Sequence, residues 1–257
     1  MKKNGLEVQS LQRALDILEV VGNSRQPVPL KEITAQTGLP KSTVYRLLSN
    51  LEAREYIRCN ADTSYQLGLK LLMMSQRVEQ SFELKHLARP YIVELNEYTR
   101  ESVHLGMLHN NRVLYVDTVE SAHTIRLVAK VGATNWVHFT ALGKALLVQH
   151  SDEAIVKILQ EQGMDRKTAS TLVTPAAFLE EMERVRREGY AWDEQESEDG
   201  CRCVGAPIFN HKGQVVAAIS ISGPVARVSR DMASSDFVPR LLSVTRELSN
   251  SLGAVAG

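Results

Sequence analysis

The sequence predicts an α+β protein with two domains: a small N-terminal helix-turn-helix with a wing, and a larger domain of helices and antiparallel strands. Short amphipathic helices flank a turn at Gly38, and alternating apolar and polar runs pair around polar turns in both halves of the chain. The 257 residues are 44% hydrophobic and 23% charged, a globular composition. At roughly 100–200 residues per domain, two separate cores fit this length.

Three helices are predicted in the N-terminal part, over residues 9–21, 30–37 and 41–53. The first has apolar residues at the spacing of one helical stripe, namely Leu11, Leu15, Leu18 and Val21. Gly38 makes a tight turn between the second and third helices. The third has an apolar rear at i, i+3, i+4 and i+7, made of Val44, Leu47, Leu48 and Leu51.

A hairpin and a linker helix follow. Residues 55–58 and 64–67 are short alternating runs on either side of Asn60-Ala61-Asp62, which predicts a two-stranded wing. Residues 68–83 have helical periodicity, and we interpret them as a linker helix that leads into the larger domain.

The C-terminal part mixes helices with two hairpins. The predicted helices span residues 84–99, 140–150, 151–161, 175–188 and 237–252. The predicted strands span residues 102–108, 112–119, 125–131, 203–210 and 214–222. Ser151 is expected to cap one helix, and Thr174-Pro175 to start another. Antiparallel strands combined with helices make this part α+β.

The third helix has the composition of a DNA recognition helix. Its apolar rear can dock on the first two helices while a polar front fits the major groove. Lys41, Ser42 and Thr43, at the helix start, suit phosphate contacts, and Arg46 and Tyr45 suit base edges. We predict that the DNA-binding side chains are Lys41, Ser42, Thr43, Tyr45, Arg46 and Asn50.

Charge and cysteine content narrow the class of protein further. The chain carries 30 Lys+Arg and 30 Asp+Glu, but residues 1–80 have 11 and 8, a net of +3, which leaves −3 for the rest. The part of the chain with a net positive charge therefore contains the predicted recognition helix. No apolar run approaches the ~18 residues that cross a bilayer, and the first residues do not read as a signal peptide. With three cysteines, we expect a cytoplasmic protein without a membrane partner.

Five segments together resemble the IclR family of bacterial transcription regulators. They are residues 10–18, 41–48, 140–147, 200–209 and 218–224. The resemblance implies a winged helix-turn-helix at 1–68, a linker helix at 69–83 and a GAF-like effector-binding domain at 84–257. It also implies homodimers or homotetramers on palindromic operator DNA, and we expect the protein to be a repressor. Within the family, the chain is similar to regulators that respond to sugar acids such as 2-keto-3-deoxygluconate or an aldonate.

The resemblance also implies a pocket for a small organic acid, and no cofactor. The matching positions are Ala141, Leu142, Asp193, Cys203, Ser220 and Ser222. Ser220 and Ser222 lie two apart on one strand, so both hydroxyls face the same side. The backbone N–H groups of Leu142 and Gly143, at a helix start, can bind a carboxylate. Leu127 is expected to form an apolar wall.

Other interpretations of these residues stay open at this point. The serines can lie on a solvent face, Cys203 can be a small buried apolar residue, and Asp193 belongs to an acidic run that can be solvated. A different class of function is a small-molecule enzyme or sensor whose winged helix docks protein. The segment around Gly143-Lys144 is no P-loop, and the histidines have no metal-site spacing, so neither a phosphate-loop enzyme nor a metal site is expected. A cysteine nucleophile paired with His138 or His104 is the weakest alternative.

Overall fold

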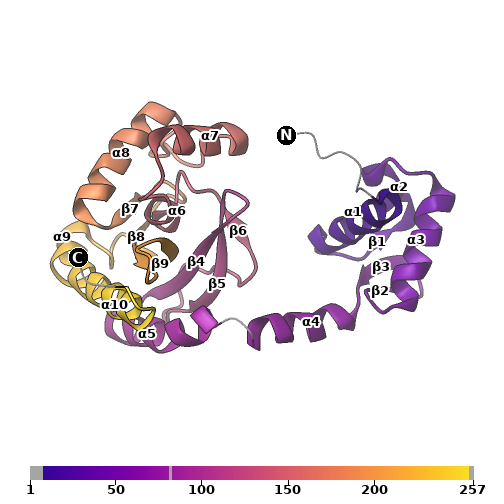
Figure 1. The fold of residues 1–257 in the computed structure, drawn as a ribbon, viewed down its shortest axis with the longest axis horizontal. Helices are drawn as coiled ribbons and strands as arrows, with labels where there is room; N and C mark the ends of the chain where they lie inside the picture. The colour runs from indigo at the N-terminus through magenta and orange to yellow at the C-terminus, as the bar shows by residue number, and fades with distance from the viewer. Residues whose placement is uncertain (1–7, 81–82, 255–257) are drawn as a thin grey trace. The chain divides into compact units, whose positions relative to one another are not determined.

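The computed structural model describes residues 8–80 and 83–254, which form two compact units, residues 1–82 and 83–257. Unit 1 contains α1 (Gln9–Asn23), β1 (Val28–Pro29), α2 (Leu30–Thr37), α3 (Lys41–Ala53), β2 (Ile57–Cys59), β3 (Ser64–Leu67) and α4 (Leu69–Gln80). Its three strands form an antiparallel sheet in the order β1-β3-β2 (Figure 1). The unit is therefore a three-helix domain with a small wing, followed by a further helix. Residues 81–82, which belong to the predicted linker helix, lie outside the described residues.

The core of unit 1 determines which face of α3 is free. Ile17 and Val21 of α1, Ile33 of α2, and Val44 and Leu48 of α3 are buried together. Between α2 and α3, Gly38 has φ 65°, a left-handed conformation that glycine adopts without a steric penalty.

The stripe predicted for α1 is only partly correct. Val21 is buried, but Leu11 and Leu15 are 59% and 48% exposed, because Ile17 points into the core in their place. The strand β1 was not predicted, since it has two residues and exists only through its pairing with Ser64 and Tyr65 of β3.

Unit 2 is a six-stranded antiparallel sheet covered by helices on both faces. The strand order is β6-β5-β4-β9-β8-β7. The strands are β4 (Ser102–His109), β5 (Arg112–Val119), β6 (Thr134–Asn135), β7 (Ala191–Glu194), β8 (Cys201–Phe209) and β9 (Val215–Pro224). The helices are α5 (Glu83–Thr99), α6 (Ala141–Leu146), α7 (Asp152–Gln162), α8 (Pro175–Glu188), α9 (Arg230–Met232) and α10 (Val238–Ser251), the last preceded by a π-helical turn, Ala233–Phe237.

The two faces of this sheet carry different helices. Helices α5 and α10 pack on one face, and α6 packs on the other, with α8 and α7 behind it (Figure 1). Ser151 and Thr174 cap α7 and α8 through their side chains, as predicted. Thr140, for which no cap was predicted, also caps a helix: its hydroxyl accepts the N–H of Gly143 at the start of α6. These caps set where the helices begin, and α6 begins directly over the sheet.

The strand predicted at residues 125–131 is wrong. This segment has no regular secondary structure, although its β-branched residues favour strands in isolation. Side chains hold its backbone instead: Ser102 Oγ donates to the carbonyl of Leu127 at 2.7 Å, and Arg227 Nη2 donates to that of Ile125 at 2.8 Å. The segment therefore lies over the polar strand end at Ser102 as an irregular cover. Strands β6 and β7, of two and four residues, were both missed.

No helix among the described residues combines the length and apolar character needed to cross a membrane. Within the same residues, no three His, Cys, Asp or Glu side chains lie close enough together to hold a metal ion.

Candidate functional site

The outward face of α3 presents cationic, hydroxyl and aromatic side chains. Val44 and Leu48 dock the helix on α1 and α2, so its opposite face points outward. Five of the six side chains predicted to contact DNA are exposed there, namely Lys41, Ser42, Tyr45, Arg46 and Asn50, and Thr43 is half-buried. This face has the shape and chemistry to enter a groove of duplex DNA.

The start of α3 adds backbone donors to this face. Pro40 precedes the helix, and its carbonyl accepts the N–H groups of Thr43 and Val44. The earlier N–H groups, of Lys41 and Ser42, have no acceptor within the helix, as is general for a first turn. Together with the helix dipole, such groups favour an anion such as a phosphate.

In unit 2, strand pairing collects polar side chains into two rows on the sheet face that α6 covers. One row runs across four strands through Asp193, Cys203, Ser222 and Ser102. The other runs through Gly205, Ser220, His104 and Thr118. Because directly paired residues point to the same side of a sheet, residues more than 100 positions apart in the chain face one space.

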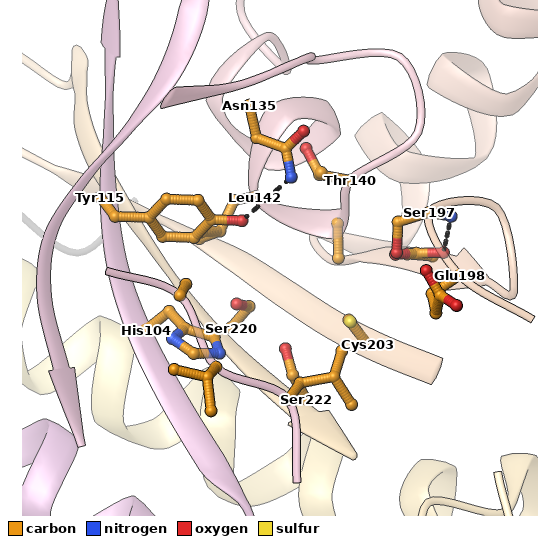
Figure 2. Close-up of a pocket in the computed structure, with 15 residues that line it drawn as sticks. His104, Tyr115, Asn135, Thr140, Leu142, Ser197, Glu198, Cys203, Ser220 and Ser222 are labelled. Carbon is orange, nitrogen blue, oxygen red and sulfur yellow. Dashed lines mark hydrogen bonds between the residues drawn. The ribbon is translucent and has the colours of Figure 1, made fainter. Parts of the chain in front are cut away.

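A cavity of about 280 Å³ lies over these rows. Its walls are the start of α6, the irregular segment at 127–129 and the turn after β7 (Figure 2). A glycine allows this close approach of helix and sheet, since a β-carbon on Gly205 would lie 3.0 Å from the carbonyl carbon and oxygen of Ala141. The lining residues are His104, Tyr115, Leu127, Val128, Ala129, Asn135, Thr140, Ala141, Leu142, Asp193, Ser197, Glu198, Cys203, Ser220 and Ser222.

Seven of the eight predicted effector-binding residues line this cavity, and Gly143 does not. The role predicted for Gly143 is wrong because its N–H already donates to Thr140 Oγ1 at 3.1 Å. Gly143 serves packing instead: a β-carbon there would lie 2.3 Å from the Cα of Val137. The solvated alternative for Asp193 is also wrong, because that side chain is buried.

Sequence reasoning missed several lining residues, above all His104, Tyr115, Asn135, Ser197 and Glu198. His104 had been considered only as a partner for a cysteine nucleophile. The strand alternation from Ser102 to His104 was the available signal, because it places both on the face of Ser220 and Ser222 once β4 and β9 pair. Nothing local marks Asn135 or Ser197, which reach the cavity through a two-residue strand and a turn.

The imidazole of His104 is buried and neutral. Burial lowers its pKa to about 4. Its Nδ1 lies 3.2 Å from Thr118 Oγ1, and its ring meets that of Tyr115 edge to face at 5.7 Å. The neighbouring hydroxyl of Ser220 has no hydrogen-bond partner within the described part of the chain, although the residue is buried and lies beside His104 (Figure 2). A hydroxyl that faces a cavity without a protein partner is available to bond to a ligand or to water.

Asp193 shapes the acidic end of the cavity. Its carboxylate accepts the backbone N–H groups of Glu196 at 2.7 Å and Ser197 at 3.2 Å, and also the Ser197 hydroxyl. Burial raises the pKa of Asp193, while the hydrogen bonds from Ser197 and the backbone oppose that rise. Asp193 thus fixes the turn that places Ser197 and Glu198 at the cavity.

A buried lysine holds the same turn from α6. Lys144 is fully buried, and its Nζ donates to the carbonyl of Trp192 at 2.7 Å and to Glu196 Oε1. Glu181 of α8 lies 3.6 Å from the same Nζ. The amine is therefore enclosed by acceptors, and no lysine or arginine is among the residues that line the cavity. An acid bound there would depend on neutral donors such as hydroxyl and backbone N–H groups.

Two family models match the chain. The model described as the IclR helix-turn-helix domain matches residues 10–60, and the model described as the bacterial transcriptional regulator IclR C-terminal domain matches residues 76–250. The two matches fall on unit 1 and almost wholly on unit 2.

Relatives and solved structures agree with these matches over nearly the whole length. The chain is 32% identical over 247 residues to the HTH-type transcriptional regulator KdgR of Dickeya chrysanthemi, covering 96% of this chain and 80% of that protein. It is 32% identical over 252 residues to the transcriptional repressor IclR of Escherichia coli K12, covering 97% and 92%. The crystal structure of the Thermotoga maritima IclR matches with a TM-score of 0.74 at 29% identity, covering 96% of this chain and 100% of that chain.

Proposed function

Because the chain belongs to the IclR family of bacterial transcriptional regulators, and is a regulator rather than an enzyme, we propose that it is a ligand-responsive repressor in the cytoplasm. Residues 1–68 bind palindromic operator DNA as a winged helix-turn-helix, residues 69–83 are the linker helix, and residues 84–257 bind a small organic acid. Ligand binding changes the relative placement of the two DNA-reading domains in a dimer. A coupling of ~1–3 kcal/mol between two such sites is typical.

The observation that carries the DNA-binding proposal is the outward face of α3. Its rear is committed to the core through Val44 and Leu48, so Lys41, Ser42, Tyr45 and Arg46 have no packing role on the front. Arg46, in the middle of the helix, reads a base edge, and Lys41, at its start, contacts phosphate. Two such helices in a dimer meet half-sites about one helical turn, or a multiple of it, apart.

Arg46→Ala and Lys41→Ala are expected to weaken DNA binding in different ways. Loss of a base contact by Arg46 should cost ~1–3 kcal/mol on the best site and relax specificity at one position. Loss of Lys41 should weaken binding to all sequences alike and reduce the salt slope by about 1. The measurement is fluorescence anisotropy on duplexes selected from a random pool, at several salt concentrations.

Lys157→Ala is the control for these variants, because Lys157 is an exposed lysine of unit 2. Equal binding of the parent and the Arg46 variant to the selected site would reject the base contact. A sequence-selective loss in the Lys41 variant would reject its assignment to phosphate.

The cavity in unit 2 supports a bipolar ligand. Hydroxyls of Ser220 and Ser222, with the first N–H groups of α6, offer neutral donors to a carboxylate. At the other end, Asp193 and Glu198 offer acceptors to ligand hydroxyls. A hydroxylated acid, such as a 2-keto-3-deoxy sugar acid or an aldonate, matches both ends. Small acids of this kind fit within a cavity of about 280 Å³.

Ser220→Ala and Ser222→Ala are each expected to weaken the binding of such an acid by roughly tenfold to a hundredfold. A hydrogen bond to a charged group is worth about 1.5–3 kcal/mol, and the carboxylate has no cation in the cavity to replace it. Calorimetry with 2-keto-3-deoxygluconate, D-gluconate and the uncharged polyol sorbitol tests this. Ser243→Ala, on α10 and outside the cavity, is the matched control. Unchanged affinity in both pocket variants would remove the serines from the site, and preference for sorbitol would reject an acid as the ligand.

Exposed apolar side chains in unit 1 support self-association. Leu11 and Leu15 of α1, with Leu69, Leu72 and Met73 of α4, are all exposed, and Leu69 is 73% exposed. Large apolar side chains left exposed on helices are a common feature of protein interfaces. A homodimer formed through these helices presents two copies of α3 to a palindromic site, and pairing of dimers gives a homotetramer.

A further inference from the structure

We infer that the ion pair between Arg89 and Asp117 transmits the state of the cavity to α5, the helix that enters unit 2 directly from the DNA-binding unit. The inference rests on the proposed function, because it assigns a route by which the ligand site and the DNA site affect each other. Arg89 and Asp117 act as positioning residues, since neither lines the cavity.

The first step of the route is on the cavity face of the sheet. His104 lines the cavity and Thr118 is its directly paired neighbour on β5, with His104 Nδ1 3.2 Å from Thr118 Oγ1. The other ring nitrogen, Nε2, has no hydrogen bond within the described residues. A ligand that accepts from or donates to Nε2 therefore acts on a ring whose opposite side is already bonded to Thr118.

The second step passes through the strand to the other face. The backbone N–H of Thr118 donates to Asp117 Oδ1 at 2.9 Å, and the carbonyl of Thr118 accepts from Arg89 Nη1 at 3.2 Å. The same Nη1 donates to Asp117 Oδ1 at 3.0 Å. Arg89 thus holds both Thr118 and Asp117, so a displacement of Thr118 by His104 changes the bonds that attach α5 to β5.

Two features make this contact suited to a second arrangement. Asp117 is buried, yet its Oδ2 has no hydrogen-bond partner among the described residues, so this oxygen can accept from a rearranged guanidinium group. The pairing of β4 with β5 also shifts register between Leu105 and Gly106, next to the pair of Leu105 with Asp117. A β-bulge of this kind interrupts the ladder locally, which lets Asp117 and Thr118 shift without breaking the pairing along the rest of β5.

The position of Arg89 in the chain gives the contact its consequence. Arg89 lies in the second turn of α5, which begins at Glu83, and unit 1 ends at residue 82. Arg89 therefore anchors the first two turns of α5, the part of unit 2 that follows the linker in the chain. Asn96, by contrast, bonds the carbonyls of Glu101 and Glu120 near the far end of α5, where it fixes the helix but is remote from the linker.

A double-mutant cycle tests the route without a ligand. His104→Gln alters the residue at the cavity, and Arg89→Met removes the ion pair with Asp117. The DNA affinity of the full chain is measured by fluorescence anisotropy on a duplex selected from a random pool. We expect His104→Gln to change the dissociation constant at least fivefold in the parent background and less than twofold in the Arg89→Met background. A merely structural role of Arg89 would leave the size of the His104 effect unchanged.

Lys157→Met is the control background, because it removes an exposed ion pair with Glu161 in unit 2, and neither residue lines the cavity. The effect of His104→Gln should persist there in full. Tryptophan fluorescence checks that each variant is folded. An equal His104 effect in both the parent and Arg89→Met backgrounds, or no effect in either, overturns the route while leaving DNA binding intact. Failure of the parent to bind any selected duplex rejects the proposed function itself.

Discussion

Replacing Lys144 with Met is expected to destabilise unit 2 by about 3–5 kcal/mol, because it leaves Glu196 buried without its cation. In the described part of the chain, Glu196 Oε2 has no hydrogen-bond partner, so the lysine is the main compensation for that buried carboxylate. Both tryptophans, Trp136 and Trp192, lie in unit 2, so urea unfolding followed by tryptophan fluorescence reports this unit within the full chain.

The loss caused by Lys144→Met should also depend on pH. Burial raises the pKa of Glu196, and attraction to Lys144 opposes that rise. Without the lysine, the pKa of Glu196 in the folded state rises further. A carboxyl whose pKa is higher in the folded than in the unfolded state costs stability as pH increases above the unfolded value, near 4.5. The deficit should therefore be larger at pH 8 than at pH 5.

Two further variants make this prediction specific. Lys157→Met removes an exposed pair with Glu161, at 3.9 Å, and should change the free energy of unfolding by no more than about 0.5 kcal/mol. Glu196→Gln combined with Lys144→Met should recover part of the loss and abolish most of its pH dependence. A loss of the same size at both pH values would show that packing, not the buried charge, is responsible.

Gly143→Ala is expected to destabilise unit 2 by about 3 kcal/mol, although helix propensity alone predicts a gain of about 1 kcal/mol. The added β-carbon would lie 2.3 Å from the Cα and 2.4 Å from the carbonyl oxygen of Val137. Both are backbone atoms, so α6 must shift away from the turn at Val137 that precedes it, and with it Ala141 and Leu142 at the cavity.

Gly106→Ala is the informative comparison. Its β-carbon would lie 3.0 Å from Leu142 Cδ1, the end of a flexible side chain that can rotate away. The cost should be about 1 kcal/mol, measured by the same fluorescence-detected unfolding. Stabilisation by Gly143→Ala would mean that α6 does not pack on Val137 as described.

Prediction from sequence worked best where local chemistry decides the structure. The α2–Gly38–α3 turn was located because a glycine is needed at positive φ and because the apolar spacing of α3 is regular. Ser151 and Thr174 were identified as caps because their hydroxyls act within one helical turn. Such signals depend on no distant partner, so they can be recognised in a single sequence.

Prediction from sequence failed where residues far away in the chain determine the local structure. Residues 125–131 have the composition of a strand, but Ser102 and Arg227, far away in the chain, fix them as an irregular cover. Gly143 was given a ligand-binding N–H because the competing acceptor, Thr140 Oγ1, was not considered. Asn135 reaches the cavity only through a two-residue strand that pairs with β5, which no periodicity in the sequence reveals.

The two cross-strand rows under the cavity have a consequence for how such a scaffold diversifies. Strand pairing sets the register of the sheet, so the side chains at positions 203, 220 and 222 can be exchanged one at a time without rebuilding any loop. Each exchange alters the chemistry at one place on the cavity floor. Descendants of one ancestral regulator can therefore acquire new effectors by point substitution, while the DNA-binding unit stays unaltered.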